Sequence, residues 1–189
     1  MDGLQFIGRF LAGEFTLSTA SSRPDTKRRP ASSSELRTRT SKFFRGPKPK
    51  LDPKACCFKL RIGRSKIHRW GVFAEERIPK RRKVIEYTGE RISRAETKRR
   101  AESALNYLFT LNSYWTVDGA VGGSGAEFVN HCCEPNLHAQ IIHGRILYMS
   151  KRDIEPGEEL TIDYHFDKDV EKVPCRCGAL NCRGTINVK

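Results

Sequence analysis

The nonapeptide PGEELTIDY, residues 156–164, decides much of the fold. It opens with a proline and a glycine, which together form a strong turn signal. After the turn, Leu160, Ile162 and Tyr164 alternate with polar residues, which is the period of a strand that has one buried face. We therefore expect a short strand that carries these three side chains.

The sequence outside this segment shows the same period of two. Apolar residues alternate over 107–111 and again over 115–117. Two further apolar runs, 141–142 and 146–148, flank the dipeptide His143-Gly144, which suits a two-residue hairpin turn. These segments predict a domain that is built mainly from short strands.

One helix is expected within this domain. Ser93 has the side chain of an N-cap, Glu96 follows three residues later as its capping-box partner, and a charged run continues to about Ala104. A glycine-rich loop over 119–125 comes next. The residues therefore predict a mostly β fold with one or two short helices.

The first 54 residues differ from the rest. Apolar residues are scattered over 1–17 and suffice for one short amphipathic helix, whereas 18–54 consists mainly of Ser, Thr, Pro, Lys and Arg. Such a composition buries too little apolar area to offset its chain entropy, so we expect a disordered basic arm. An Arg- and Ser-rich, acid-poor segment is also compatible with a transit peptide.

Charge is concentrated in this arm. The chain carries a formal charge of +13, from 35 Lys and Arg against 22 Asp and Glu, and +8 of it falls on residues 18–54. A basic segment favours acidic surfaces, so the arm is a candidate nucleic-acid contact, although a solvated tail fits as well. No apolar run approaches the ~18 residues that a membrane span needs, and the N-terminus lacks the features of a secretory signal. A membrane partner is therefore not expected.

Five of the seven cysteines fall into two groups, Cys132-Cys133 and the trio Cys175, Cys177 and Cys182. Closely spaced cysteines in a chain without a secretory signal read as metal ligands more readily than as disulfides, which indicates a reducing, intracellular compartment. Structural zinc sites take four tetrahedral ligands, and thiolates are favoured among them. The trio supplies only three, so a fourth ligand must come from another part of the chain.

Four segments, in this order, resemble the SET-domain protein lysine methyltransferases. They are IHRWGVF with VIEYTGE (67–73 and 84–90), EFVNHCCEPN (127–136), GEELTIDY (157–164), and the cysteine group that begins at Cys175, which is similar to the post-SET zinc motif. The resemblance implies a SET-type fold of several small sheets with short helices and a C-terminal zinc-bound tail. It divides the chain into the basic arm (1–54), a SET domain (55–168) and a post-SET zinc segment (169–189).

The family implies S-adenosylmethionine as cofactor and methyl donor, and a protein lysine ε-amine as acceptor. By resemblance, the backbone around Arg69, Trp70 and Gly71 and the pair Asn130-His131 hold the cofactor. Glycine at position 71 permits close backbone approach, because no Cβ intervenes.

Two tyrosines receive catalytic roles through the same resemblance. Tyr164 ends the segment that is similar to the family's catalytic tyrosine motif, and Tyr107 resembles the second tyrosine of the lysine channel. A tyrosine hydroxyl can orient the amine while its ring walls an apolar channel. The fourth zinc ligand is implied to be Cys133, so that the ligand set is Cys133, Cys175, Cys177 and Cys182.

The chain departs from the family pattern at three positions that bear on function. Arg69 stands where a glycine is common, and Glu127 replaces an arginine, which reverses a charge close to the cofactor motif. Ile162 occupies the product-number position, where members usually carry Phe or Tyr and which influences how many methyl groups are added. An isoleucine has no hydroxyl to hold a water molecule beside the amine, so we expect this position to allow multiple methylation.

The leading hypothesis is methylation of a protein lysine, with a histone tail first among the substrates and the nucleus or chromatin as location if the source is eukaryotic. The same chemistry on a non-histone protein is one alternative. A SET-like module that binds chromatin or nucleic acid with little or no turnover is another. Cofactor binding without methyl transfer would favour the module.

Overall fold

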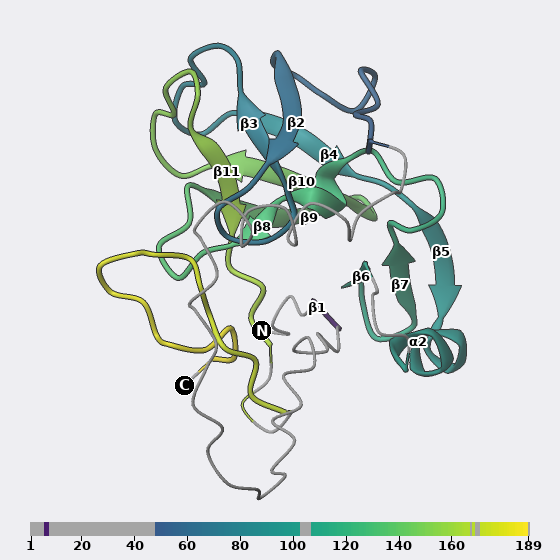
Figure 1. The fold of residues 1–189 in the computed structure, drawn as a ribbon. Helices are drawn as coiled ribbons and strands as arrows, with labels where there is room; N and C mark the ends of the chain where they lie inside the picture. Colours follow the sequence, from purple (N-terminus) through teal and green to yellow (C-terminus); the bar gives the residue numbers. More distant parts are fainter. Residues whose placement is uncertain (1–5, 8–47, 103–106, 167, 169–170, 189) are drawn as a thin grey trace, which may run out of the picture. The chain divides into compact units, whose positions relative to one another are not determined.

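The computed structural model describes residues 6–7, 48–102, 107–166, 168 and 171–188 (Figure 1). From residue 49 onward they belong to one compact unit. Their strands form three small sheets, accompanied by one α-helix and one short 3-10 helix in the described part of the chain. The expected fold class, mostly β with several small sheets and short helices, is confirmed.

The first sheet holds the segment 157–164 at its centre. Its order is β2 (Leu60–Arg64), β3 (Trp70–Ala74), β11 (Glu159–Ile162) and β8 (Asn130–His131). β11 runs antiparallel to β3 and parallel to β8, with Thr161 opposite Asn130. The expected strand forms but ends at Ile162, so Tyr164 lies just beyond its end. The parallel pairing brings two of the motif segments side by side (Figure 1).

The second sheet contains the predicted hairpin. Its order is β4 (Lys83–Tyr87), β10 (Arg145–Ser150) and β9 (Leu137–Ile142). The β9–β10 turn is made by His143 and Gly144, whose φ angles of 49° and 73° are both positive, as a type I′ hairpin turn requires. In this register Tyr148 of β10 lies opposite Ala139 of β9 and Ile85 of β4.

The third sheet contains the only strand described before residue 48. Its order is β1 (Phe6–Ile7), β6 (Leu108–Thr110), β7 (Trp115–Asp118) and β5 (Glu90–Ser93). In place of the helix expected over residues 1–17, β1 pairs antiparallel with β6. A short helix without tertiary packing is marginal in water, whereas pairing with a neighbouring strand satisfies the backbone groups. The rest of 1–17, and residues 18–47, lie outside the described residues.

Helix α2 (Arg94–Ala101) follows β5 directly and begins as predicted (Figure 1). The hydroxyl of the N-cap, Ser93, accepts the backbone N–H of Glu96 at 3.3 Å. The predicted extension to Ala104 is not seen, because Glu102 is the C-cap and the two residues after it lie outside the described ones. Among the described residues, no helix has both the length and the apolar content that crossing a bilayer requires.

Packing around the core starts before residue 55. Leu51 packs against the core, and the backbone N–H of Asp52 donates to the carbonyl of Ser124 at 2.9 Å. The last residues of the segment expected to be a disordered arm, from residue 48 onward, are therefore described and in part packed. The remainder of that arm lies outside the described residues.

Candidate active site and metal centre

Asn130 fastens the loop before β3 to the central sheet. Its side-chain amide donates to the carbonyl of Trp70 at 2.9 Å, to the carbonyl of His68 at 3.3 Å and to Oε1 of Glu159 at 2.8 Å. The side chain is buried, so these acceptors would otherwise lose much of their solvation. Asn130 therefore fixes the backbone of the segment that the sequence assigns to the cofactor.

Arg69, in the middle of this loop, adopts a φ of 42°. This is the left-handed region that favours glycine, which explains why a glycine is common there and shows that the loop keeps that conformation with an arginine. The pKa of the neighbouring His68 is lowered, chiefly by burial and then by the charges of Arg69 and Arg176. The loop therefore lies close to the C-terminal tail, which contains Arg176.

Gly71 leaves room for a carboxyl group of the protein itself. A Cβ at this position would lie 2.3 Å from Oε1 of Glu159 and 3.1 Å from Cβ of Ser65. The hydroxyl of Ser65 donates to the other carboxylate oxygen of Glu159 at 3.0 Å. The lack of a Cβ at Gly71 thus lets the side chain of Glu159, on β11, approach the backbone of β3 closely.

His131 connects the candidate catalytic tyrosine with the cysteine group. The backbone N–H of Tyr164 donates to Nδ1 of His131 at 3.2 Å, so the proton of the neutral ring resides on Nε2. Nε2 lies 3.4 Å from Sγ of Cys133 and can donate to it. Burial lowers the pKa of His131 to about 4, which keeps the ring neutral at physiological pH.

Tyr164 is buried, and its hydroxyl makes a hydrogen bond within the protein. The hydroxyl donates to the carbonyl of Val129 at 2.8 Å, and the ring stacks on Phe166 with centroids 5.9 Å apart. Burial, followed by the charge of Tyr107, raises the pKa of Tyr164 well above its ordinary value. The phenol is therefore neutral at physiological pH, with its hydrogen donated to Val129.

A second buried tyrosine, Tyr87, completes an aromatic group that the sequence analysis did not assign. Its hydroxyl donates to the carbonyl of Tyr107 at 2.6 Å. The Tyr107 ring meets Phe128 edge-on at 5.6 Å. The pKa of Tyr87 is raised by burial and then by the charges of Glu127 and Tyr164, so its phenol faces the same region as Tyr164. Tyr87 could have been predicted to be buried from its place in VIEYTGE, because it lies on the same face of the strand as Ile85.

The glycine-rich loop is built around Glu127. The carboxylate accepts the backbone N–H of Gly125 at 2.8 Å, and a Cβ on Gly123 would lie only 2.5 Å from Oε1. Burial raises the pKa of Glu127 to about 7. The carboxylate that replaces the family's arginine is thus half-buried, beside Tyr107, whose pKa it raises further after burial.

Four cysteines form a metal-binding geometry. The Sγ atoms of Cys133, Cys175, Cys177 and Cys182 all lie within 4.8 Å of one another. The distance from Cys133 Sγ is 3.8 Å to Cys175 and 3.9 Å to Cys182. Tetrahedral zinc with Zn–S bonds of about 2.3 Å places its sulfurs about 3.8 Å apart, so the group fits zinc. Cys132 is not one of the four: its thiol donates to the carbonyl of Glu134, although it lies next to Cys177.

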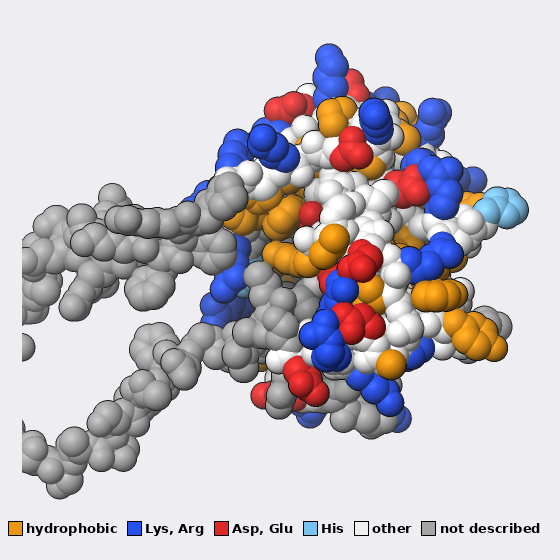
Figure 2. Space-filling view, turned by 90° about the vertical axis from the view of Figure 1, so that its right-hand side faces the viewer, with side chains coloured by type: hydrophobic (Ala, Val, Ile, Leu, Met, Phe, Trp, Pro, Cys, Tyr) orange, Lys and Arg blue, Asp and Glu red, His pale blue; other side chains and the backbone are white. Residues whose placement is uncertain are grey.

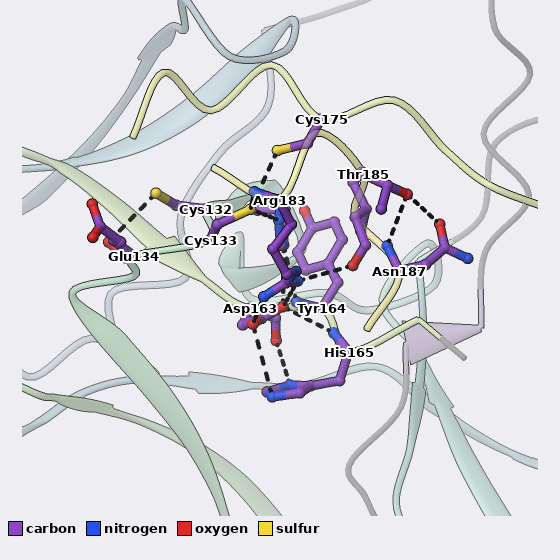
Figure 3. Close-up of polar contacts among 12 residues, drawn as sticks. Cys132, Cys133, Glu134, Asp163, Tyr164, His165, Cys175, Arg183, Thr185 and Asn187 are labelled. Carbon is purple, nitrogen blue, oxygen red and sulfur yellow. Dashed lines mark hydrogen bonds and ion pairs between the residues drawn. The ribbon is translucent and has the colours of Figure 1, made fainter. Parts of the chain in front are cut away.

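An ion pair connects the cysteine-rich tail to the segment that contains Tyr164 (Figure 3). The guanidinium of Arg183 donates to both carboxylate oxygens of Asp163, at 2.7 and 2.8 Å, and to the carbonyl of Ile186 at 3.1 Å. Burial would raise the pKa of Asp163, but hydrogen bonds from Arg183 and the backbone of His165 hold it below its ordinary value. The tail therefore contacts the residue that directly precedes Tyr164.

A cavity of about 200 Å³ opens beside this segment. Cys133 and Pro135 of the loop before β9 line it, together with the polar residues His138, Lys151, Asp163 and His165. The remaining lining residues, from β6, β9 and β11, are Phe109, Leu137, Ala139 and Ile162.

The described residues thus bring together what the sequence assigned to separate segments. Asn130 reaches the Arg69–Trp70 loop, His131 contacts Tyr164, and the four candidate zinc ligands converge. The SET domain family matches residues 69–165, which is more than half of the chain. The chain belongs to the SET-domain family.

Individual relatives carry the comparison further. A histone-lysine N-methyltransferase of Saccharomyces cerevisiae, H3 lysine-4 specific, is 41% identical over 139 residues, which are 67% of this chain and 13% of the relative. The human histone-lysine N-methyltransferase SETD1A is 40% identical over 68% of this chain and 8% of its own length. The chain therefore spans a small part of these relatives.

Solved structures show the same fold. KRYPTONITE in complex with mCHG DNA and SAH matches with a TM-score of 0.61 and 33% identity, over 69% of this chain and 29% of that one. KRYPTONITE with mCHH DNA, an H3(1–15) peptide and SAH matches with a TM-score of 0.59 and 32% identity, over 69% and 30%.

Proposed function

We propose that this chain transfers methyl groups from S-adenosylmethionine to a lysine ε-amine of a histone tail. Two neighbouring contacts carry the proposal: Asn130 donates to the carbonyl of Trp70 at 2.9 Å, and the next residue, His131, accepts the backbone N–H of Tyr164 at 3.2 Å. Relatives named histone-lysine N-methyltransferases and neighbours solved with SAH support it. Action on chromatin, and hence a nuclear location, follows from this substrate.

The cofactor site would be formed by the backbone of Arg69, Trp70 and Gly71 and by the pair Asn130-His131. When bound, S-adenosylmethionine supplies an electrophilic methyl group on a sulfonium. Asn130 pre-organises the loop, because its amide already holds two of the loop carbonyls. Such pre-organisation lowers the entropic cost of alignment, which is the main contribution an enzyme can make to an in-line transfer.

Tyr164 acts as an acceptor and not as a base. Its O–H is donated to Val129, and a phenol oxygen can also accept from polarised C–H groups or from the N–H of the acceptor amine. Its raised pKa keeps it from removing a proton near neutral pH, and the lysine proton passes to solvent. Tyr107, whose carbonyl holds the Tyr87 hydroxyl, lines the same region and is assigned to the channel.

The cavity beside β11 is proposed as the acceptor pocket. Phe109, Leu137, Ala139 and Ile162 provide apolar walls suited to the methylene stem of a lysine, and the polar part is lined by His138, Lys151, Asp163 and His165. Among these lining residues, Ile162 occupies the position that influences how many methyl groups are added, and its side chain has no hydroxyl.

A zinc ion on Cys133, Cys175, Cys177 and Cys182 would hold the tail against the catalytic segment. The backbone N–H groups of Arg183 and Gly184 donate to the sulfurs of Cys133 and Cys182, at 3.4 Å each, and such hydrogen bonds stabilise metal-bound thiolates. Metal binding and tail folding are therefore expected to be coupled.

The basic segment 18–54 is proposed to contact nucleic acid and to bring the enzyme to chromatin. On the face shown in Figure 2, basic and acidic side chains of the described residues are interspersed. The uncompensated charge of +8 lies in the segment itself, so salt-sensitive binding is expected to depend on it.

The decisive test is radiolabelled methyl transfer to core histones and to whole-cell extract. Tyr164→Phe should reduce the rate by about 10²-fold, since misplaced reacting groups cost on this order. Tyr114→Phe is the matched control, because Tyr114 is 76% exposed. Equal rates for Tyr164→Phe and the wild type would contradict the catalytic assignment. Cofactor binding in calorimetry without transfer to any lysine would show a binding module, and labelling only of extract proteins would show a non-histone substrate.

A further inference from the structure

Strand β1 holds the outer edge of the third sheet. Its two residues pair antiparallel with β6, so that Phe6 lies opposite Phe109 and Ile7 lies opposite Leu108. Two residues supply few backbone hydrogen bonds, and each such bond contributes little net free energy in water. A longer extended peptide makes more of these bonds, so it can replace β1 at this edge.

The edge of β6 that β1 holds is suited to binding a peptide. The opposite edge is closed by β7, where Val117 lies opposite Phe109, and the carbonyl of Tyr107 accepts the backbone N–H of Gly119 at 2.9 Å. In the part of the chain that the structure describes, β1 is therefore the outermost strand beside β6. Without β1, this edge would present unpaired N–H and C=O groups, with which an extended peptide forms main-chain hydrogen bonds.

This edge adjoins the cavity proposed as the acceptor pocket. Phe109 lines that cavity and is also the residue of β6 that lies opposite Phe6. Tyr107, which is assigned to the lysine channel, directly precedes β6. A lysine that enters the cavity therefore brings the neighbouring residues of its peptide beside β6, where β1 lies.

The segment that contains β1 offers no methyl acceptor. Residues 1–17 contain no lysine, and their one basic side chain is that of Arg9. An arginine guanidinium stays protonated in proteins, so it does not provide the neutral amine that the transfer requires. The segment therefore occupies the edge of β6 without being consumed as a substrate.

We propose that β1 is an autoinhibitory strand, which an acceptor peptide displaces from the edge of β6 before its lysine enters the cavity. The proposal rests on the proposed function. Competition at this edge raises the KM for the peptide, because only the molecules whose edge is open bind it. Cofactor binding and kcat stay unchanged, since the residues assigned to the cofactor belong to β3, the loop before it and β8.

The test compares the full-length wild type with the double variant Phe6→Pro/Ile7→Pro, which removes both backbone N–H groups of β1. Phe15→Pro/Thr16→Pro, outside β1, is the matched control. Initial rates of methyl transfer to a histone H3 peptide are measured at saturating S-adenosylmethionine. The KM for the peptide should fall about fivefold or more in the β1 variant, with kcat unchanged, and should stay at the wild-type value in the control.

Two further measurements separate competition from a structural role. A synthetic peptide of residues 1–12, added to the β1 variant, should inhibit competitively against the H3 peptide and not against S-adenosylmethionine. Calorimetry should give the same Kd for S-adenosylmethionine in the wild type and in the β1 variant.

The outcomes distinguish this proposal from the proposed function. Methyl transfer with an unchanged or raised KM in the β1 variant overturns autoinhibition and leaves the methyltransferase activity standing, as does a 1–12 peptide that fails to compete. A lowered melting temperature together with a lowered kcat shows a strand that only completes the sheet, and also overturns it. Transfer by the β1 variant and none by the wild type supports autoinhibition, whereas absence of transfer by both folded proteins overturns both proposals.

Discussion

The ion pair between Arg183 and Asp163 gives the sharpest quantitative prediction. Arg183 follows directly after the candidate zinc ligand Cys182, and Asp163 directly precedes Tyr164. Replacing Arg183 with glutamine removes the guanidinium and leaves the carboxylate in its half-buried place. We expect a large loss of stability, because the change separates the tail from the catalytic segment.

The magnitude follows from the burial of the two side chains. Arg183 is 17% exposed and Asp163 is 14% exposed, and the contact is bidentate. Removing one partner of a buried pair typically destabilises by about 3–5 kcal/mol, whereas an exposed pair contributes about 0.2–1 kcal/mol. Asp163 keeps one other donor, the backbone N–H of His165 at 3.2 Å. The free energy of unfolding of Arg183→Gln should therefore fall by about 2–4 kcal/mol.

Urea unfolding of zinc-supplemented protein at pH 7 measures this loss. Arg152→Gln is the control, since its guanidinium pairs with Glu158 at 2.6 Å but is 55% exposed, and its loss should stay below about 1 kcal/mol. Adding Asp163→Asn to Arg183→Gln removes the unpaired charge and should recover part of the stability. The reasoning is refuted if Arg183→Gln costs no more than Arg152→Gln, or if the double variant recovers nothing.

Two further predictions concern the metal centre and the carboxyl in the glycine-rich loop. Cys133→Ser should lower bound zinc, measured by elemental mass spectrometry, from about one per chain to near zero, and should make the tail sensitive to limited proteolysis; full zinc retention would contradict the ligand assignment. Burial raises the pKa of Glu127 from 4.5 to about 7, so the folded state holds this proton more tightly than the unfolded chain and stability falls as pH rises through that window. Glu127→Gln should therefore unfold like the wild type at pH 4 and be more stable by up to about 3 kcal/mol at pH 8 in thermal melts. An equal difference at both pH values would contradict this.

Much of the fold could be predicted because its signals are local. The alternation in 157–164, the turn at His143-Gly144 and the N-cap at Ser93 each depend on residues within a few positions of one another. The same holds for the cysteine trio, whose spacing alone indicated a metal. Pairing of β1 with β6 was beyond such reasoning, because its partner lies about 100 residues away in the sequence.

The site was predictable only where a motif supplied the long-range information. The motif placed Asn130, Tyr164 and Cys133, but it gave no reason for their mutual contacts. In the sequence, Arg183 and Asp163 look like ordinary charged surface residues. Their pairing appears only when the tail folds back to within hydrogen-bond distance of Asp163.

Tyr148 shows why an apolar run does not by itself predict which of its side chains is buried. The run 146–148 is apolar throughout, so its composition did not indicate which side chain would point inward. The register of β10 decides this, because Tyr148 is buried whereas Leu147 and Met149 are half-buried. Cross-strand pairing of Tyr148 with Ala139 and Ile85 fixes which face of β10 packs into the core. An apolar run therefore predicts a buried strand but not which of its side chains is buried, because that depends on pairing with strands that are distant in the sequence.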